Sequence, residues 1–162
     1  MHPEPRLRPI RTAHAAALAL AAFACVATPA RAGVELGIGA DQAIEGHSTS
    51  VLALDFVTGQ DRHPWEFAVG RFGAHHPTGN LDYAPATWYL AVSRRIQWGH
   101  VFVSGGIAYD TADDDVLSGH WQFATGIGVR IDRWTVSLHH LSNAGLVGHN
   151  HGETFGLVSF AF

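Results

Sequence analysis

The sequence predicts an all-β protein, an eight-stranded antiparallel transmembrane β-barrel of the outer-membrane type. Three observations predict this class. Runs of about ten residues, rich in aromatic and β-branched types, recur along the chain, and turn residues follow each run. The connections between these runs alternate between short and long, which is typical of outer-membrane barrels. The final run ends in phenylalanine. Eight strands make a barrel whose interior side chains can fill.

Residues 1–32 are expected to be a secretory signal peptide, which leaves residues 33–162 as a single β-barrel domain. The segment begins with arginines and continues with an apolar stretch at residues 13–27, which is too short to span a membrane as a helix. It closes on a small-x-small pattern ending at Ala32, so we expect cleavage between Ala32 and Gly33.

The composition argues against nucleic-acid binding and against disulfides in the barrel. All 10 basic residues are arginine, and the formal net charge is −4, so there is no basic footprint for nucleic acid. The single cysteine, Cys25, lies in the expected signal peptide. It allows a lipoprotein signal as an alternative, although Ala22 stands where such a signal requires leucine.

The first four strands are expected at residues 34–40, 50–58, 65–72 and 87–96. A modest turn containing Gly59 and Pro64 joins the second strand to the third. Longer loops, at residues 41–47 and 73–86, follow the first and the third. Short and long connections therefore alternate from the start of the barrel.

The last four strands are expected at residues 100–109, 121–131, 134–141 and 154–162. Gln97-Trp98-Gly99 and Asp132-Arg133 are short turns, whereas residues 111–120 and 143–152 form longer loops. Glycines within these strands would weaken a soluble sheet, but they suit a barrel wall that bends or packs closely. In the closing strand Val158, Phe160 and Phe162 share one face, which resembles the insertion signal of outer-membrane barrels.

Tryptophans and charged residues add expectations about the two faces of the wall. The five tryptophans fall near strand ends, where interfacial girdles would place them, although an aromatic core is the alternative. Glu66, Arg71 and Arg130 are expected to form interior ion pairs.

The seventh expected strand carries a candidate catalytic pair. Residues two apart share a face, so His140 and Ser142 align with Trp134, Val136 and Leu138 on the apolar, lipid-facing side. Polar groups on that side have no packing role and cost free energy, which indicates a function. Histidine is the usual base that activates a serine nucleophile.

Two further features could complete such a site. Glu153, on the adjoining strand, could accept a hydrogen bond from the histidine and fix its tautomer. The segment Asn143-Ala144-Gly145 would offer an amide side chain and backbone N–H groups to a developing oxyanion.

The run His140-Leu141-Ser142-Asn143-Ala144-Gly145, followed by Asn150, Gly152 and Glu153, resembles the PagL-type lipid A 3-O-deacylase family. Those proteins are eight-stranded outer-membrane barrels that hydrolyse the ester of the 3-hydroxyacyl chain at position 3 of lipid A. The resemblance implies a serine esterase with a Ser-His-Glu triad. It makes Ser142 the nucleophile, His140 the general base and Glu153 the orienting acid, with Asn143 and Gly145 at the oxyanion hole. One departure stands out: the family often has a residue between the glycine and the glutamate, whereas Gly152 and Glu153 are adjacent.

The resemblance also implies location and partners. It predicts the outer membrane of a Gram-negative cell, with the active site facing the outer leaflet, where lipopolysaccharide is the substrate. Outer-membrane lipid surrounds the barrel, and a homodimer is left open. No cofactor is expected. The alternatives are a non-enzymatic structural or adhesive barrel, and a secreted β-sandwich that binds metal through its histidines.

Loop histidines and aspartates are expected to be hydrated. His75, His76, His149 and His151 show no spacing of a structural zinc site, so no metal site is predicted. The run of aspartates at residues 113–115 is expected to be a loop tip, with a lipid-bridging cation as the alternative.

Overall fold

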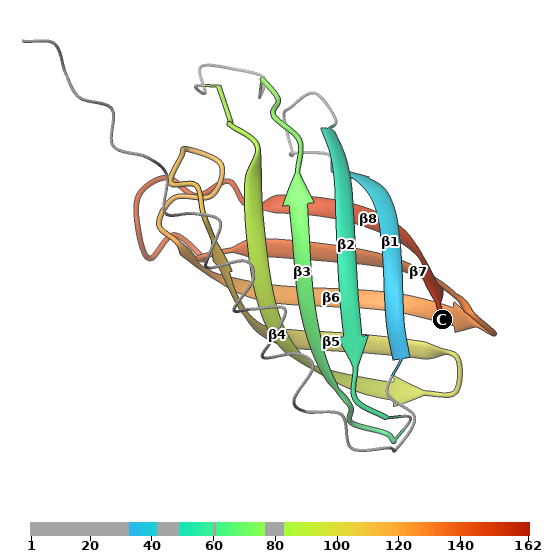
Figure 1. The fold of residues 1–162 in the computed structure, drawn as a ribbon. Coiled ribbons are helices and arrows are strands. Elements are labelled where there is room, and N and C mark those ends of the chain that lie inside the picture. Colours follow the sequence, from blue (N-terminus) through green and yellow to red (C-terminus); the bar gives the residue numbers. More distant parts are fainter. Residues whose placement is uncertain (1–32, 42–48, 60, 77–82) are drawn as a thin grey trace, which may run out of the picture.

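The fold is a closed antiparallel barrel, seen in a computed structural model that describes residues 33–41, 49–59, 61–76 and 83–162. Each strand pairs with its sequence neighbours, and β8 closes the barrel against β1 (Figure 1). The strands are β1 (Gly33–Asp41), β2 (Thr49–Val57), β3 (Trp65–Phe72), β4 (Thr87–Trp98), β5 (Val101–Asp110), β6 (Trp121–Ile131), β7 (Trp134–Ser142) and β8 (Glu153–Ala161). The predicted fold class is confirmed, and no strand boundary differs from its prediction by more than 2 residues.

The expected signal peptide, residues 1–32, lies outside the described residues. Within the described part of the chain, no helix is long and apolar enough to cross a membrane.

Antiparallel order places alternate connections at opposite ends of the barrel. We name these the turn end, which carries the connections β2–β3, β4–β5 and β6–β7, and the loop end, which carries the connections β1–β2, β3–β4, β5–β6 and β7–β8. Residues 111–120 and 143–152 lie at the loop end together with the last residue of β1 and the first of β8. The connections β1–β2 and β2–β3 are equally long, so the expected contrast in length begins with β3–β4.

The outer face of the wall is apolar and is bordered by tryptophans. The strands alternate between buried and exposed positions, and the exposed positions carry large apolar side chains such as Ile38, Leu52 and Ile127. All five tryptophans are 45–65% exposed. Trp65, Trp98 and Trp134 lie at the turn end, and Trp88 and Trp121 lie at the loop end. The prediction that the tryptophans form interfacial girdles is therefore confirmed, and the alternative of an aromatic core is wrong.

One expected interior arginine is on the outside. Arg71 is exposed and its guanidinium lies 5.9 Å from the Trp88 ring centroid. The prediction that it pairs inside was wrong because Arg71 stands an odd number of positions from Glu66, which places the two on opposite faces of β3.

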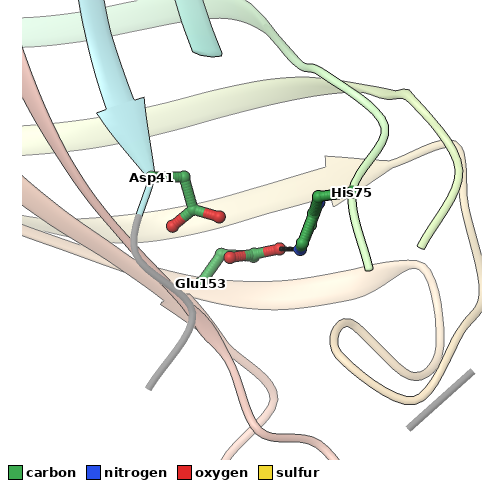
Figure 2. Close-up of side chains that lie close together, drawn as sticks. All are labelled: Asp41, His75 and Glu153. Atoms are coloured by element: carbon green, nitrogen blue, oxygen red, sulfur yellow. Dashed lines mark ion pairs between the residues drawn. The ribbon is translucent and has the colours of Figure 1, made fainter. Parts of the chain in front are cut away.

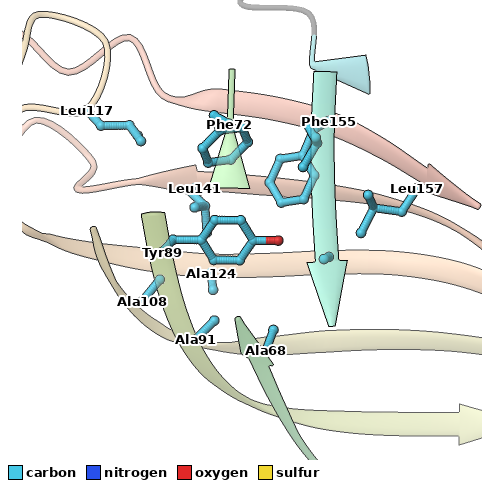
Figure 3. Close-up of a cluster of buried hydrophobic side chains, with 12 residues drawn as sticks. Ala68, Phe72, Tyr89, Ala91, Ala108, Leu117, Ala124, Leu141, Phe155 and Leu157 are labelled. Carbon is cyan, nitrogen blue, oxygen red and sulfur yellow. The ribbon is translucent and has the colours of Figure 1, made fainter. Parts of the chain in front are cut away.

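The barrel interior holds three successive groups of side chains. Nearest the loop end is a polar group formed by Asp41, His75 and Glu153 (Figure 2). Next comes an apolar cluster in which the rings of Phe72, Tyr89 and Phe155 contact one another (Figure 3). The close packing of this cluster fills the lumen, as expected for a small barrel.

Charged side chains occupy the interior toward the turn end. Arg95 forms ion pairs with Glu66 and Glu35, and Arg130 also pairs with Glu35. These contacts confirm that Glu66 and Arg130 take part in interior ion pairs, although with other partners than each other. Buried charges require such pairing because burial removes their hydration.

Candidate functional site

His140 and Ser142 lie on the outer face of β7 at the loop end. Trp134, Val136 and Leu138 precede them on that face and are exposed, whereas the intervening residues of β7 include buried ones. Both members of the pair are partly exposed. The prediction that both side chains share the outer face of β7 is thus confirmed. The imidazole and the hydroxyl lie next to each other at the loop end of an apolar surface.

The imidazole of His140 is held from β8. The strand register pairs His140 with Thr154, and Nδ1 of the ring lies 2.9 Å from the Thr154 hydroxyl oxygen. If Nδ1–H donates to that oxygen, Nε2 carries the lone pair and can accept a proton. With Nδ1–H as the donor, the tautomer is the one that a general base needs.

Gly152 closes the other edge of the ring. Its φ is +74°, and a Cβ added there would lie 2.7 Å from Cε1 and 3.0 Å from Nε2 of His140. Any other residue would both strain the backbone and collide with the imidazole. The glycine is thus required for the close approach of the loop to His140.

Ser142 is hydrogen-bonded to the loop that follows it. Its hydroxyl donates to Asn150 Oδ1 at 2.8 Å, and the backbone N–H of Ala144 donates to Ser142 Oγ at 3.1 Å. Among the described residues, the hydroxyl is therefore paired with Asn150 rather than with His140. Residues two apart on a strand are separated by roughly 6.6 Å at Cα, so their side chains can approach by rotation.

The predicted oxyanion residues hold the loop in place. The Asn143 side chain is only 2% exposed, and its amide donates to the carbonyls of Ser118 and Val147. Its Oδ1 accepts the backbone N–H of Gly145 at 2.8 Å. Asn143 and Gly145 thus bond to each other and to the neighbouring loop, and the N–H that reaches Ser142 is that of Ala144.

Glu153 lies inside the barrel and does not meet His140. The β7–β8 register runs without a break and pairs Glu153 with Leu141, whose side chain is buried in the lumen. Glu153 is 2% exposed and its Oε1 lies 3.5 Å from Nε2 of His75. The structure therefore brings together His140, Ser142 and the loop, but it leaves the predicted acid on the opposite side of the wall.

Comparison with known families identifies the chain. The model of the family described as "Lipid A 3-O-deacylase (PagL)" matches residues 31–162. The chain belongs to the PagL family. A search of curated proteins and a search of solved structures each found no match. PagL membership implies lipid A deacylase activity with lipid A as substrate, and together with the barrel it indicates the outer membrane.

The residue of β8 that contacts His140 is Thr154, two positions after Gly152 and one position beyond Glu153. Among the described residues, the side chain at Nδ1 of His140 is therefore a neutral hydroxyl and not the carboxylate expected from the sequence.

Sequence reasoning missed Thr154, Asn150 as the partner of Ser142, and the burial of His75. The parity of β8 was a usable signal for Thr154, because residues two apart share a face and Thr154 matches the outward Val158. Asn150 and His75 gave no such signal, since their contacts depend on how loops fold over the barrel end.

Proposed function

We propose that this PagL-family protein is a serine esterase that removes the ester-linked 3-hydroxyacyl chain at position 3 of lipid A, with Ser142 as nucleophile and His140 as general base. One observation carries the proposal: both side chains lie on the outer, apolar face of the barrel, where a lipid ester can reach them. A position inside the filled lumen would have excluded such a substrate.

The reaction would begin when the Ser142 hydroxyl rotates away from Asn150 toward His140. Nε2 of His140 takes the hydroxyl proton as Oγ bonds to the ester carbonyl carbon. Collapse of the tetrahedral intermediate breaks the bond to the sugar oxygen, and His140 returns its proton to that oxygen. Water, deprotonated by His140, then attacks the acyl-serine and releases the fatty acid.

The negative oxygen of the intermediate would be bound by the Asn143–Gly145 segment. The backbone N–H of Ala144 already points at Ser142 Oγ and is released when the hydroxyl rotates, which makes it the proposed donor. In this proposal Asn143 and Gly145 act by fixing the conformation of the segment rather than by donating from the Asn143 amide, which the loop occupies.

Thr154 takes the orienting role in our proposal, in place of Glu153. Its hydroxyl oxygen lies within hydrogen-bonding distance of His140 Nδ1, whereas Glu153 is inside the barrel. A neutral hydroxyl can set the tautomer, but it cannot stabilise the imidazolium as a carboxylate does. We therefore expect a slower enzyme than one with a glutamate at this position.

The surroundings of the pair suit an acyl substrate at the membrane border. Phe123, which pairs with Ser142 across the β6–β7 ladder, is exposed beside it, and Leu146 in the following loop is 74% exposed. We propose that the loop end faces the outer leaflet, so that acyl chains lie against this apolar surface. We also propose that residues 1–32 are removed on export.

The proposal is tested by mass spectrometry of lipid A from cells expressing each variant. Ser142→Ala and His140→Ala should insert as barrels and lose deacylation, by about 10³-fold or more, because the nucleophile or its base is gone. Ser137→Ala is the matched control, since Ser137 lies on the same strand but faces the lumen. Retained deacylation in Ser142→Ala would refute the nucleophile assignment, and inactivity of the native protein would favour a non-enzymatic barrel.

A further inference from the structure

Three metal-ligating side chains meet inside the barrel at the loop end, on the opposite side of the wall from His140. Asp41 ends β1, His75 follows β3, and Glu153 begins β8 (Figure 2). Their exposed fractions are 0%, 7% and 2%. One ligand atom from each lies within 4.8 Å of the other two.

The backbone around His75 fixes which ring nitrogen faces the carboxylates. His75 forms an isolated bridge with Ala84, with both backbone hydrogen bonds at 3.0 Å. Its Nδ1 lies 3.4 Å from the Gly73 carbonyl oxygen, to which it can only donate. With Nδ1 donating to the carbonyl, Nε2 faces Glu153 and has a free lone pair. Metal-binding histidines are commonly oriented by a hydrogen bond of this kind from the other ring nitrogen.

Two buried atoms of this group, one on His75 and one on Glu153, lack a hydrogen-bond partner among the described residues. Nε2 of His75 lies 3.5 Å from Glu153 Oε1, too far for a good hydrogen bond. Within the described residues, neither Nε2 of His75 nor Oε2 of Glu153 has any hydrogen-bond partner, although both are buried. A buried acceptor that faces another acceptor is costly unless a cation or a proton lies between them.

The two acids of the group also suit a divalent cation. Without an ion, Glu153 shares a hydrogen bond with Asp41, so that one of the two acids holds a proton. With both acids ionised, the three side chains carry a formal charge of −2, which one divalent ion would neutralise. The interior arginines are engaged toward the turn end, where Arg95 pairs with Glu66 and Arg130 pairs with Glu35. An imidazolium at His75 would balance only one of the two carboxylates.

We propose that Asp41, His75 and Glu153 bind a divalent transition-metal ion of the zinc type. One imidazole nitrogen and two carboxylate oxygens suit Zn²⁺ better than Ca²⁺ or Mg²⁺, which prefer oxygen alone. Ligands about 2.1 Å from zinc lie about 3.4 Å apart in a tetrahedron, so side-chain rotations of modest size would bring these atoms to the ion. The ion would tie β1, β3 and β8 together where the barrel closes.

The proposed metal site is connected to His140 on the outer face through Glu153, because both chain neighbours of Glu153 contact His140. Glu153 is flanked by Gly152, which packs against the His140 ring, and by Thr154, which contacts His140 Nδ1. Fixing Glu153 from inside would therefore fix the start of β8 and, with it, the orientation of the imidazole outside. This second consequence rests on the proposed function, whereas metal binding does not.

The test is zinc titration of the detergent-folded protein after dialysis against a chelator, by isothermal calorimetry and by thermal unfolding. The native protein should bind one Zn²⁺ and unfold at a higher temperature with zinc. His75→Gln and Glu153→Gln should each weaken binding at least tenfold. His76→Gln is the matched control, because His76 is the exposed neighbour of His75 and should leave binding unchanged.

Several results would overturn the proposal. They are the absence of a zinc-dependent shift in the native protein, equal zinc affinity in His75→Gln, and binding of Ca²⁺ in preference to Zn²⁺. If the variants fail to fold, the visible spectrum of Co²⁺ bound to the native protein replaces them, and absence of a nitrogen–oxygen cobalt spectrum counts against the site. Ser142→Ala should still bind zinc, so failure of the esterase proposal and failure of the metal site are distinguishable.

Discussion

At the scale of single residues, the two ring nitrogens of His140 have different surroundings. Nδ1 contacts the hydroxyl of Thr154, and the Nε2 edge faces Gly152, where no side chain could fit. Ser142 lies two residues away on the same face. The position of the imidazole beside it depends on the hydrogen bond to Thr154 and on the absence of a Cβ at Gly152. Gly152 and Thr154 flank Glu153, the first residue of β8, so the start of that strand orients the imidazole.

Thr154→Glu should increase the rate of deacylation, by about tenfold to a hundredfold. A carboxylate at this position would accept the Nδ1–H and stabilise the imidazolium that forms when Ser142 loses its proton. Thr154→Val should lower the rate, since valine keeps the shape but removes the hydroxyl. The measurement is the initial rate of fatty-acid release from lipid A in mixed micelles.

A second threonine serves as the control for that substitution. Thr125 pairs with His140 from β6 on the same outer face. An equal rate increase in Thr125→Glu would mean that added charge alone is responsible, and not the hydrogen bond to Nδ1.

The limits of sequence reasoning are clearest at Glu153 and Thr154. The pair His140 and Ser142 was placed on the correct face because alternation within one strand is a local property. Glu153 was assigned from motif spacing, and a displacement of one residue in β8 moves a side chain through the wall. The contacts of His75 could not be predicted from residue spacing, because they depend on how the segment after β3 folds over the end of the barrel.

At the scale of elements, the loop at residues 143–152 is bound to its neighbour at residues 111–120. Ser118 Oγ donates to the Val147 carbonyl at 2.6 Å, and Gly152 N–H donates to the Val116 carbonyl at 2.9 Å. Asn143 and Asn150 add side-chain contacts with Ser118. The loop that carries the proposed oxyanion donor is thus ordered by hydrogen bonds and not by a hydrophobic core.

Asn143→Ala should loosen this loop while leaving the barrel intact. The substitution removes the Asn143 amide from the carbonyls of Ser118 and Val147 and leaves the Gly145 N–H without its acceptor, which costs about 1–3 kcal/mol locally. We expect faster amide hydrogen exchange at residues 143–152, a fall in deacylation, and little change in the unfolding of the strands. Unchanged exchange in this loop would contradict the role given to Asn143.

At the scale of the whole molecule, the fold follows from period-two patterns and turn residues. Both are local, which is why all eight strands could be predicted to within 2 residues at either boundary. The closure of β1 on β8 and the pairing inside the lumen are non-local. Glu66 and Arg130 were recognised as interior groups. That Arg95 pairs with both Glu66 and Glu35, and that Glu35 also pairs with Arg130, depends on the register of four strands.

Arg95→Met should destabilise the whole barrel. Arg95 is buried and paired with Glu66 and Glu35, so its removal leaves carboxylates in the interior without that partner, at a cost of about 3–5 kcal/mol. Urea unfolding of the detergent-folded protein would measure the change.

Arg94→Met is the matched control for this change. Arg94 is the exposed neighbour and lies 4.8 Å from the Trp65 ring centroid. Its removal should cost only about 0.5–1 kcal/mol. Equal losses for the two arginines would show that the interior pairs do not govern stability.

The outward position of His140 and Ser142 has a consequence for encounter with a lipid. A lipid in the same leaflet reaches His140 and Ser142 by lateral diffusion, without leaving the bilayer and without passing through a pore. The relevant concentration is then the number of lipids per unit area. Dilution with inert detergent at constant bulk lipid would slow turnover, as the distance between protein and lipid on the shared surface increases.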